Sequence, residues 1–148
     1  MGPHPISLVG SMLMVAPTRP GAQTLAAYAA LEYAQVRGVK VVGELGNQYA
    51  TVPRNHIGLV RPYQAMTGAL AELSLQIELI RIADAGQDIL RAAVGVVPGY
   101  TYCVRRPDGS ELYFSAQINA LMNGAFDAKS IAEQRCAMTV TSKVFEAN

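Results

Sequence analysis

Residues 72–79 read Glu-Leu-Ser-Leu-Gln-Ile-Glu-Leu, a strict alternation of polar and apolar side chains. A two-residue period is typical of a β-strand that has one face in the core and the other in solvent. The leucines and the isoleucine would face the core, while Glu72, Ser74, Gln76 and Glu78 would share the polar face. The stretch therefore predicts a long amphipathic strand in a mostly β domain.

The residues after this strand predict one short helix, over about residues 84–94. The side chain of Asp84 can accept hydrogen bonds from the free amides of a first helical turn. Gln87 stands three residues later, where a capping-box side chain reaches back to the cap residue. Gly95 and Pro98 are expected to end the helix.

Further strands are predicted on both sides of this strand and helix. Residues 31–36 and 39–45 are expected to be two strands joined by a tight turn at Arg37-Gly38. A second hairpin is expected to turn at Pro107-Asp108-Gly109, because these residue types favour tight turns. A last strand is predicted over residues 133–144. The predicted class is mostly β (α+β), a β-sandwich or barrel-like domain with one flanking helix.

Two segments of the chain show no strand or helix period. Residues 1–23 contain four prolines around a short apolar island and are predicted to be an extended N-terminal arm. Residues 24–148 are predicted to be one β domain. Its first eight residues, 24–31, are rich in alanine, but a helix of that length is marginal on its own. Within the domain, residues 46–68 are predicted to be a long loop.

The composition of the 46–68 loop favours a docking element. The segment carries aromatic and apolar side chains and two arginines but no acidic residue, whereas disordered linkers avoid such apolar residues. The alternative is a loop that folds back over its own core. The residues assigned to docking are Tyr49, Arg54, His56, Ile57, Arg61 and Tyr63.

The composition suits a protein that buries much of its surface. The chain has 148 residues, the size of one domain, and only 16% of them are charged, where about 25% is usual. Either the core is unusually large or parts of the surface are covered by other subunits, and we favour the second interpretation. The net charge of +1 does not indicate binding to nucleic acid or to an anionic membrane.

The sequence predicts folding in a cytoplasm. The longest apolar run near the N-terminus, residues 6–16, is too short to cross a bilayer and is followed by Pro17. The first five residues lack the basic region of a signal peptide. Cys103 and Cys136 fall in predicted strands and are expected to be buried thiols rather than a disulfide.

Residues that could carry chemistry are sparse. The two histidines, His4 and His56, lie in predicted loops, and no cluster has the spacing of a metal site. Glu72 and Glu78 lie roughly 20 Å apart along a strand, too far for a glycosidase pair, which needs roughly 5–10 Å. The sequence therefore predicts no enzyme activity, no metal and no cofactor.

The order of short motifs along residues 28–144 resembles that of the major tail tube protein of long, non-contractile-tailed bacteriophages (siphovirus type). The motifs that carry the resemblance are Tyr28-Ala-Ala-Leu31, Gly43-Glu-Leu-Gly46, Asp84-Ala-Gly-Gln87 with Leu90-Arg-Ala-Ala93, and Tyr113-Phe-Ser-Ala-Gln117. The front of the chain, residues 1–20, matches no pattern of that family.

The resemblance implies a structural virion protein of the tail, assembled in the host bacterial cytoplasm. Subunits of this family form hexameric rings that stack into a tube through which DNA leaves the capsid. One sheet of each subunit contributes to a barrel around the lumen, and the N-terminal arm and a long loop bridge to neighbours. The implied partners are further copies of the chain, a tape measure protein inside the tube, a tail terminator, a distal tail protein and passing DNA, but no membrane.

On this interpretation the polar face Glu72, Ser74, Gln76 and Glu78 lines the lumen. Each phosphate that a protein neutralises adds affinity for DNA, so a wall along which DNA slides should not be basic. Two alternatives stay open. One is a terminator or head–tail joining protein, which forms a single ring on a related fold. The other is a small-molecule-binding β-barrel, which requires a pocket with convergent polar groups.

Overall fold

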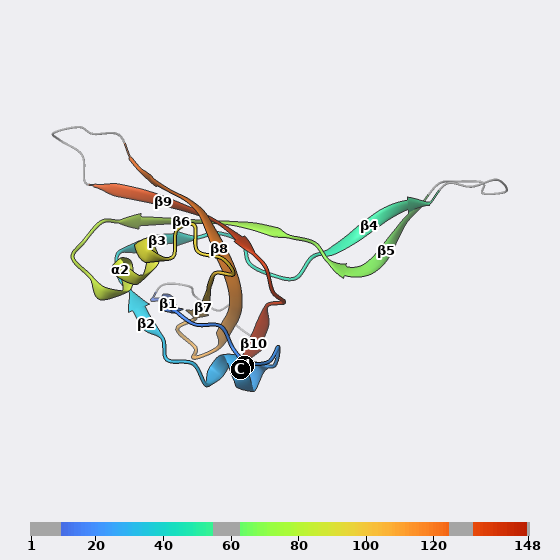
Figure 1. The fold of residues 1–148 in the computed structure, drawn as a ribbon, viewed down its shortest axis with the longest axis horizontal. Helices are drawn as coiled ribbons and strands as arrows, with labels where there is room; N and C mark the ends of the chain where they lie inside the picture. The colour runs from blue at the N-terminus through green and yellow to red at the C-terminus, as the bar shows by residue number, and fades with distance from the viewer. Residues whose placement is uncertain (1–9, 55–62, 125–131, 148) are drawn as a thin grey trace, which may run out of the picture.

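The computed structural model describes residues 10–54, 63–124 and 132–147. Most of them belong to strands (Figure 1). In chain order the elements are β1 (Met12–Ala16), α1 (Leu25–Ala29), β2 (Ala34–Val36), β3 (Val39–Val42), β4 (Tyr49–Arg54), β5 (Tyr63–Leu70), β6 (Leu73–Ile80), α2 (Ala85–Ala92), β7 (Tyr100–Arg105), β8 (Glu111–Asn123), β9 (Glu133–Val140) and β10 (Phe145–Ala147).

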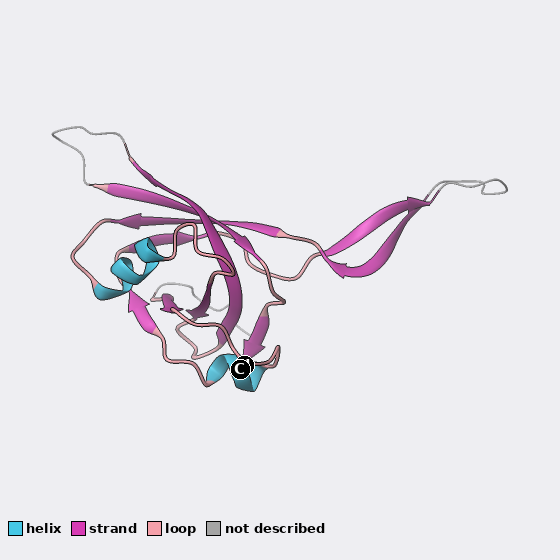
Figure 2. Cartoon of the chain, viewed as in Figure 1, coloured by secondary structure: helices cyan, strands magenta, loops and turns pink. Residues whose placement is uncertain are grey.

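Eight of the strands form one antiparallel sheet that curls around an apolar core (Figure 2). The strand order is β2-β1-β7-β8-β9-β6-β3, and β10 pairs with β8 outside this path. The sheet does not close, because β2 and β3 stand at its two ends. β4 and β5 form a separate two-stranded sheet. The predicted mostly β class is confirmed.

The strand predicted from the alternating stretch is β6. It pairs with β9 along its whole length, from Leu73 opposite Val140 to Ile80 opposite Glu133. Its alternate residues Leu75, Ile77 and Leu79 are buried in the core. Burial of three such side chains contributes about 1.5–3 kcal/mol each to the stability of the sheet.

The prediction that residues 31–45 form a hairpin is wrong. β2 pairs with β1, and β3 pairs with β6, so the two strands lie at opposite ends of the main sheet. Every neighbouring pair along the path is antiparallel, which makes β2 and β3 run in the same direction. Gly38, at a φ of 82°, breaks one extended segment into two rather than reversing it. Arg37-Gly38 therefore does not form the hairpin turn that its residue types predict.

The predicted N-terminal arm is also wrong where the structure describes it. Met12–Ala16 is a strand inside the main sheet, between β2 and β7. Leu13 and Val15 are buried in the main core, and Met14 is buried on the opposite face. A strand that is buried on both faces shows no polar alternation, which explains why the sequence pattern missed it. Residues 1–9 lie outside the described residues.

A second helix, α1, was not included in the predicted fold. Thr24 caps it, since its Oγ1 accepts a hydrogen bond from the amide of Ala27 at 3.3 Å. The ring of Tyr28 is fully buried, and its hydroxyl lies 3.2 Å from Ser115 Oγ in β8. Five helical residues are unstable alone, so these contacts with the sheet stabilise a helix that local propensity leaves marginal.

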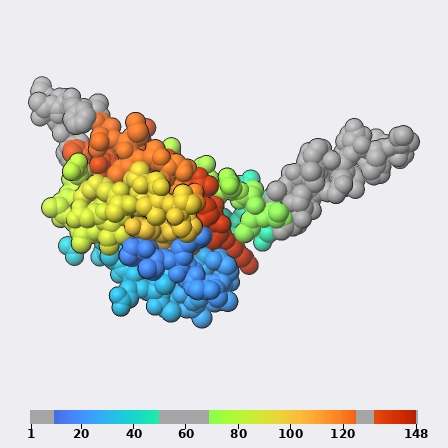
Figure 3. Space-filling view, viewed as in Figure 1, coloured from blue at the N-terminus to red at the C-terminus, as the bar shows by residue number. Residues whose placement is uncertain are grey.

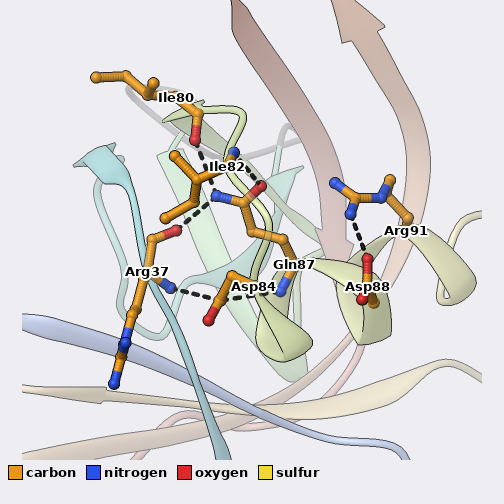
Figure 4. Close-up of polar contacts among 7 residues, drawn as sticks. All are labelled: Arg37, Ile80, Ile82, Asp84, Gln87, Asp88 and Arg91. Atoms are coloured by element: carbon orange, nitrogen blue, oxygen red, sulfur yellow. Dashed lines mark hydrogen bonds and ion pairs between the residues drawn. The ribbon is translucent and has the colours of Figure 1, made fainter.

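The predicted helix near residue 84 is confirmed as α2, but the predicted capping box is not formed. The Asp84 carboxylate accepts from the amides of Gln87 at 3.2 Å and Arg37 at 3.0 Å. The Gln87 side chain turns away from the cap and is 1% exposed (Figure 4). Its Nε2 donates to the carbonyls of Arg37 at 2.6 Å and Ile80 at 2.8 Å, and its Oε1 accepts from the amide of Ile82 at 3.2 Å. Gln87 thus joins the β2–β3 break to the end of β6.

The predicted hairpin at Pro107-Asp108-Gly109 is confirmed between β7 and β8. The amide of Arg106 donates to the carbonyl of Ser110 at 2.8 Å, which closes the turn. Thr101 to Val104 are all buried, so both faces of β7 are covered. The face away from the main core is covered by the side chains of Tyr28 in α1 and Phe145 in β10, whose ring centroids lie 5.0 Å apart.

The Tyr102 hydroxyl provides a test of the core packing. Tyr102 is fully buried beside Phe114, and its hydroxyl has no hydrogen-bond partner among the described residues. Because an unpaired buried hydroxyl is costly, Tyr102→Phe should raise the free energy of unfolding by about 1 kcal/mol. Urea denaturation measures the change. Tyr28→Phe is the matched control, since it removes a bonded hydroxyl and should lower stability. A loss of stability in Tyr102→Phe would show that the Tyr102 hydroxyl does have a stabilising partner.

Candidate assembly surfaces

The polar face of the main sheet is open to solvent. Ser74 and Gln76 in β6 are exposed, Glu78 is half-exposed, and Glu72 is exposed immediately before the strand. The four residues predicted to lie on one polar face are therefore all outside the core. Their facing partners in β9 are Thr139 opposite Ser74, Ala137 opposite Gln76 and Arg135 opposite Glu78.

Two pairs of opposite charge lie on this face. The Glu78 carboxylate lies 3.6 Å from Arg135 Nε. At the same end of the sheet, Lys40 Nζ donates to Glu133 Oε1 at 2.8 Å, which raises the pKa of Lys40 and lowers the pKa of Glu133. Both pairs are exposed and stabilise the fold little. Their effect is to place a carboxylate beside each of the two cations, Lys40 and Arg135.

The segment predicted as a long loop is instead a hairpin arm. β4 and β5 pair from Arg54 opposite Tyr63 to Tyr49 opposite Leu70. The arm extends away from the main sheet (Figure 1), and the coloured residues at its root lie beside the body (Figure 3). A two-stranded hairpin on its own is only marginally stable in water, and an arm of this kind is stabilised when it packs against another surface.

The residues assigned to docking are distributed along this arm. Tyr49 begins β4 and is 40% exposed, beside Leu70 of β5, which is 41% exposed. Arg54 ends β4 and Tyr63 begins β5, so they lie at the outer end of the described arm. His56, Ile57 and Arg61 lie outside the described residues. The root of the arm therefore exposes an aromatic and an aliphatic side chain next to each other.

A partly buried polar cluster over β7 and β8, on the same side of the sheet as the polar residues of β6, does not form a reactive site. The Glu111 carboxylate accepts from the Tyr113 hydroxyl, from Cys103 Sγ at 3.3 Å and from Arg105 at 3.3 Å. The Tyr113 hydrogen bond leads the causes that lower the pKa of Glu111. Burial raises the pKa of Cys103 to about 12, and burial likewise raises the pKa of Cys136 to about 12. Both thiols are therefore protonated at neutral pH, unlike a catalytic cysteine.

The described residues contain no group of three or more His, Cys, Asp or Glu side chains that could hold a metal ion. No helix in this part of the chain has the length and apolar character needed to cross a bilayer. The confirmed burial of both cysteines agrees with their predicted place in strands.

Two contacts that matter for the arm and the sheet were missed by sequence reasoning. Asn47 bonds the backbone of Val144, 97 residues away, and Gln87 bonds that of Arg37, 50 residues away. An asparagine before a strand and a glutamine in a helix are ordinary in sequence. No local signal could have identified either partner.

The sequence matches no protein-family model and no curated protein. Solved structures of similar fold are found among phage-like injection systems. A chain of the sheath/tube terminator of the PVC extracellular contractile injection system has a TM-score of 0.68 at 13% identity, covering 99% of both chains. A chain of the PVC sheath–tube complex has a TM-score of 0.62 at 15% identity, covering 97% of this chain and 92% of that one.

A third similar structure comes from the tail of an empty gene transfer agent particle, with a TM-score of 0.66 at 14% identity. The match covers 93% of this chain and 95% of that one. At such identities the likeness is one of fold. The chain has a tail tube-like fold, and this fold occurs in contractile systems as well, so it does not single out the non-contractile type that the motif order resembles.

Proposed function

We propose that this protein is a structural subunit of the tail tube of a phage-like particle and assembles into rings that stack. The observation that carries the proposal is the full-length fold likeness to chains of tube and terminator assemblies. The exposed hairpin arm supports stacking, because it extends beyond the body and presents apolar groups at its root. The proposal also accounts for the low charged fraction of the chain.

Six subunits in each ring and DNA passage through the lumen are parts of the same proposal. The gene transfer agent tail was solved with C6 symmetry, which supports a six-membered ring. Pairing of sheets between subunits would cover the outer edge of β3, which is the last strand of the main sheet and pairs, within the described residues, on one side only. Other tail proteins, including a tape measure protein, a terminator and a distal tail protein, are the proposed partners.

Electron microscopy of the purified protein tests the assembly. A tube subunit should form long striated tubes at high protein concentration. Isolated rings would instead support a tail terminator, the second candidate, which is favoured by the match that covers 99% of the terminator chain. A protein that remains monomeric at every concentration would contradict both functions.

The polar face of β6 is proposed to line the lumen. Its short polar groups and balanced ion pairs offer few cationic contacts to phosphate, which limits affinity and friction for DNA. Glu72, Ser74, Gln76 and Glu78 would point inward on this proposal. A structure of the assembled tube in which they point outward would contradict it.

A labelling experiment checks the lumen assignment. In Gln76→Cys tubes, a small maleimide should modify the new thiol, whereas a 5-kDa polyethylene glycol maleimide should react about tenfold or more slowly, because it must enter through the tube ends. Cys103 and Cys136 are buried and should stay unmodified. Unassembled Gln76→Cys subunits are the control and should react with both reagents. Equal reaction of both reagents with tubes would place Gln76 outside the lumen.

A further inference from the structure

The root of the hairpin arm is attached to the C-terminal part of the chain through one side chain. Asn47 Nδ2 donates to the carbonyl of Val144 at 3.1 Å, and the amide of Val144 donates to Asn47 Oδ1 at 2.7 Å. One side-chain amide thereby satisfies both backbone groups of Val144. Two hydrogen bonds to the same residue fix orientation as well as distance.

The residue that Asn47 holds is itself anchored in the body. Val144 is 7% exposed and belongs to the main core. The next residue, Phe145, begins β10, pairs with Tyr113 of β8 and packs against the buried ring of Tyr28. The anchor is therefore a well-packed part of the domain rather than a free end.

The arm begins immediately after Asn47. The carbonyl of Gln48 accepts from the amide of Ala71 at 2.7 Å, which joins the two sides of the arm at its base. The first strand pair, Tyr49 opposite Leu70, follows directly. An attachment at Asn47 therefore also holds the base of both arm strands, because these strands are joined to each other directly after it.

We infer that Asn47 is a positioning residue that sets the direction of the hairpin arm by fastening its root to the C-terminal segment. The connection between β3 and β4, residues 43–48, has no helix or strand. Its first part is held by the hydrogen bond from the Gly43 amide to the Gln76 carbonyl at 2.8 Å, and Asn47 holds its end next to the arm. Without the Asn47 contact the arm would swing about its base, and a docking element with no fixed direction loses conformational entropy when it binds. The consequence for ring stacking rests on the proposed function, while the direction of the arm does not.

Distance measurements on the unassembled subunit test the inference. Spin labels at Gln64→Cys in β5 and Asp108→Cys in the β7–β8 turn report the position of the arm relative to the body. We expect a narrow distance distribution in the parent protein and a distribution about twofold or more broader in Asn47→Ala, as expected for an element released from its attachment. Asn119→Ala is the matched control, because Asn119 is exposed and bonds Thr139 within the main sheet.

Asn47→Asp provides a second variant that keeps the side-chain shape. It retains the acceptor for the Val144 amide but replaces the donor with a carboxylate oxygen that faces the Val144 carbonyl. The distance distribution of Asn47→Asp should therefore broaden as well, while the far-ultraviolet circular dichroism of both variants stays that of the parent. An unchanged distribution in both Asn47 variants would overturn the inference.

Assembly of the same variants separates this inference from the proposed function. If the parent forms tubes, the Asn47 variants should form fewer and shorter ones, and Asn119→Ala should match the parent. If the parent forms no tubes but the distance distribution still broadens in Asn47→Ala, the proposed function fails and the role of Asn47 stands.

Discussion

A variant that lacks residues 56–61 should fold normally but form no tubes. In the sequence these residues stand between β4 and β5, and they lie outside the described residues. Removing them leaves the core and the root of the arm unchanged, so the melting temperature should stay within about 2 °C of the parent. The docking side chains predicted at His56, Ile57 and Arg61 are lost, so contact with a neighbouring ring should fail.

Negative-stain microscopy and sedimentation measure the loss of tubes, and a thermal melt monitors the fold. A variant in which six glycine and serine residues replace 56–61 is the control for length. It should also fail if the side chains carry the contact, and it should assemble if only the reach of the arm matters. Long tubes from the deletion variant itself would show that the end of the arm has no docking role.

Replacing Gln87 with leucine should cause one of the largest losses of stability available to a single substitution in this chain. Leucine fills a similar volume but cannot pair with the carbonyls of Arg37 and Ile80 or with the amide of Ile82. Leaving buried backbone groups unpaired costs about 1–3 kcal/mol each, and relaxation toward solvent recovers part of it. We expect a net loss of about 3 kcal/mol or more in the free energy of unfolding.

Urea denaturation followed by circular dichroism measures this effect. Gln76→Leu is the matched control, because Gln76 is exposed on the neighbouring strand β6 and should change stability by about 0.5 kcal/mol or less. A Gln87→Leu variant as stable as the control would show that the helix and the sheet edges are held together by other contacts.

The elements with a clear local pattern were predictable from the sequence. The alternation over residues 73–79 identified β6 and its buried face, Asp84 identified the start of α2, and Pro107-Asp108-Gly109 identified the β7–β8 turn. In each case the signal lies within a few neighbouring residues, since side-chain period, capping and turn chemistry are local properties of the chain.

The errors have a different cause. Met12–Ala16 has no polar alternation because both of its faces are covered, and residues 34–42 resemble a hairpin although their two strands pair with different partners. The segment 46–68 was predicted to be a loop because its strands build no part of the main core. Each of these features depends on which strand lies next to which, and strand pairing is decided by contacts between residues far apart in the chain.

The sequence by itself determined that the chain is mostly β and has few charged residues, because composition and side-chain period are local properties that do not depend on which segments pair. Only the tertiary structure decided that β4 and β5 pair as a hairpin arm and that Asn47 fastens its root to Val144. The physical reason is that a side-chain amide can bond almost any backbone group, and the fold alone determines which one it meets.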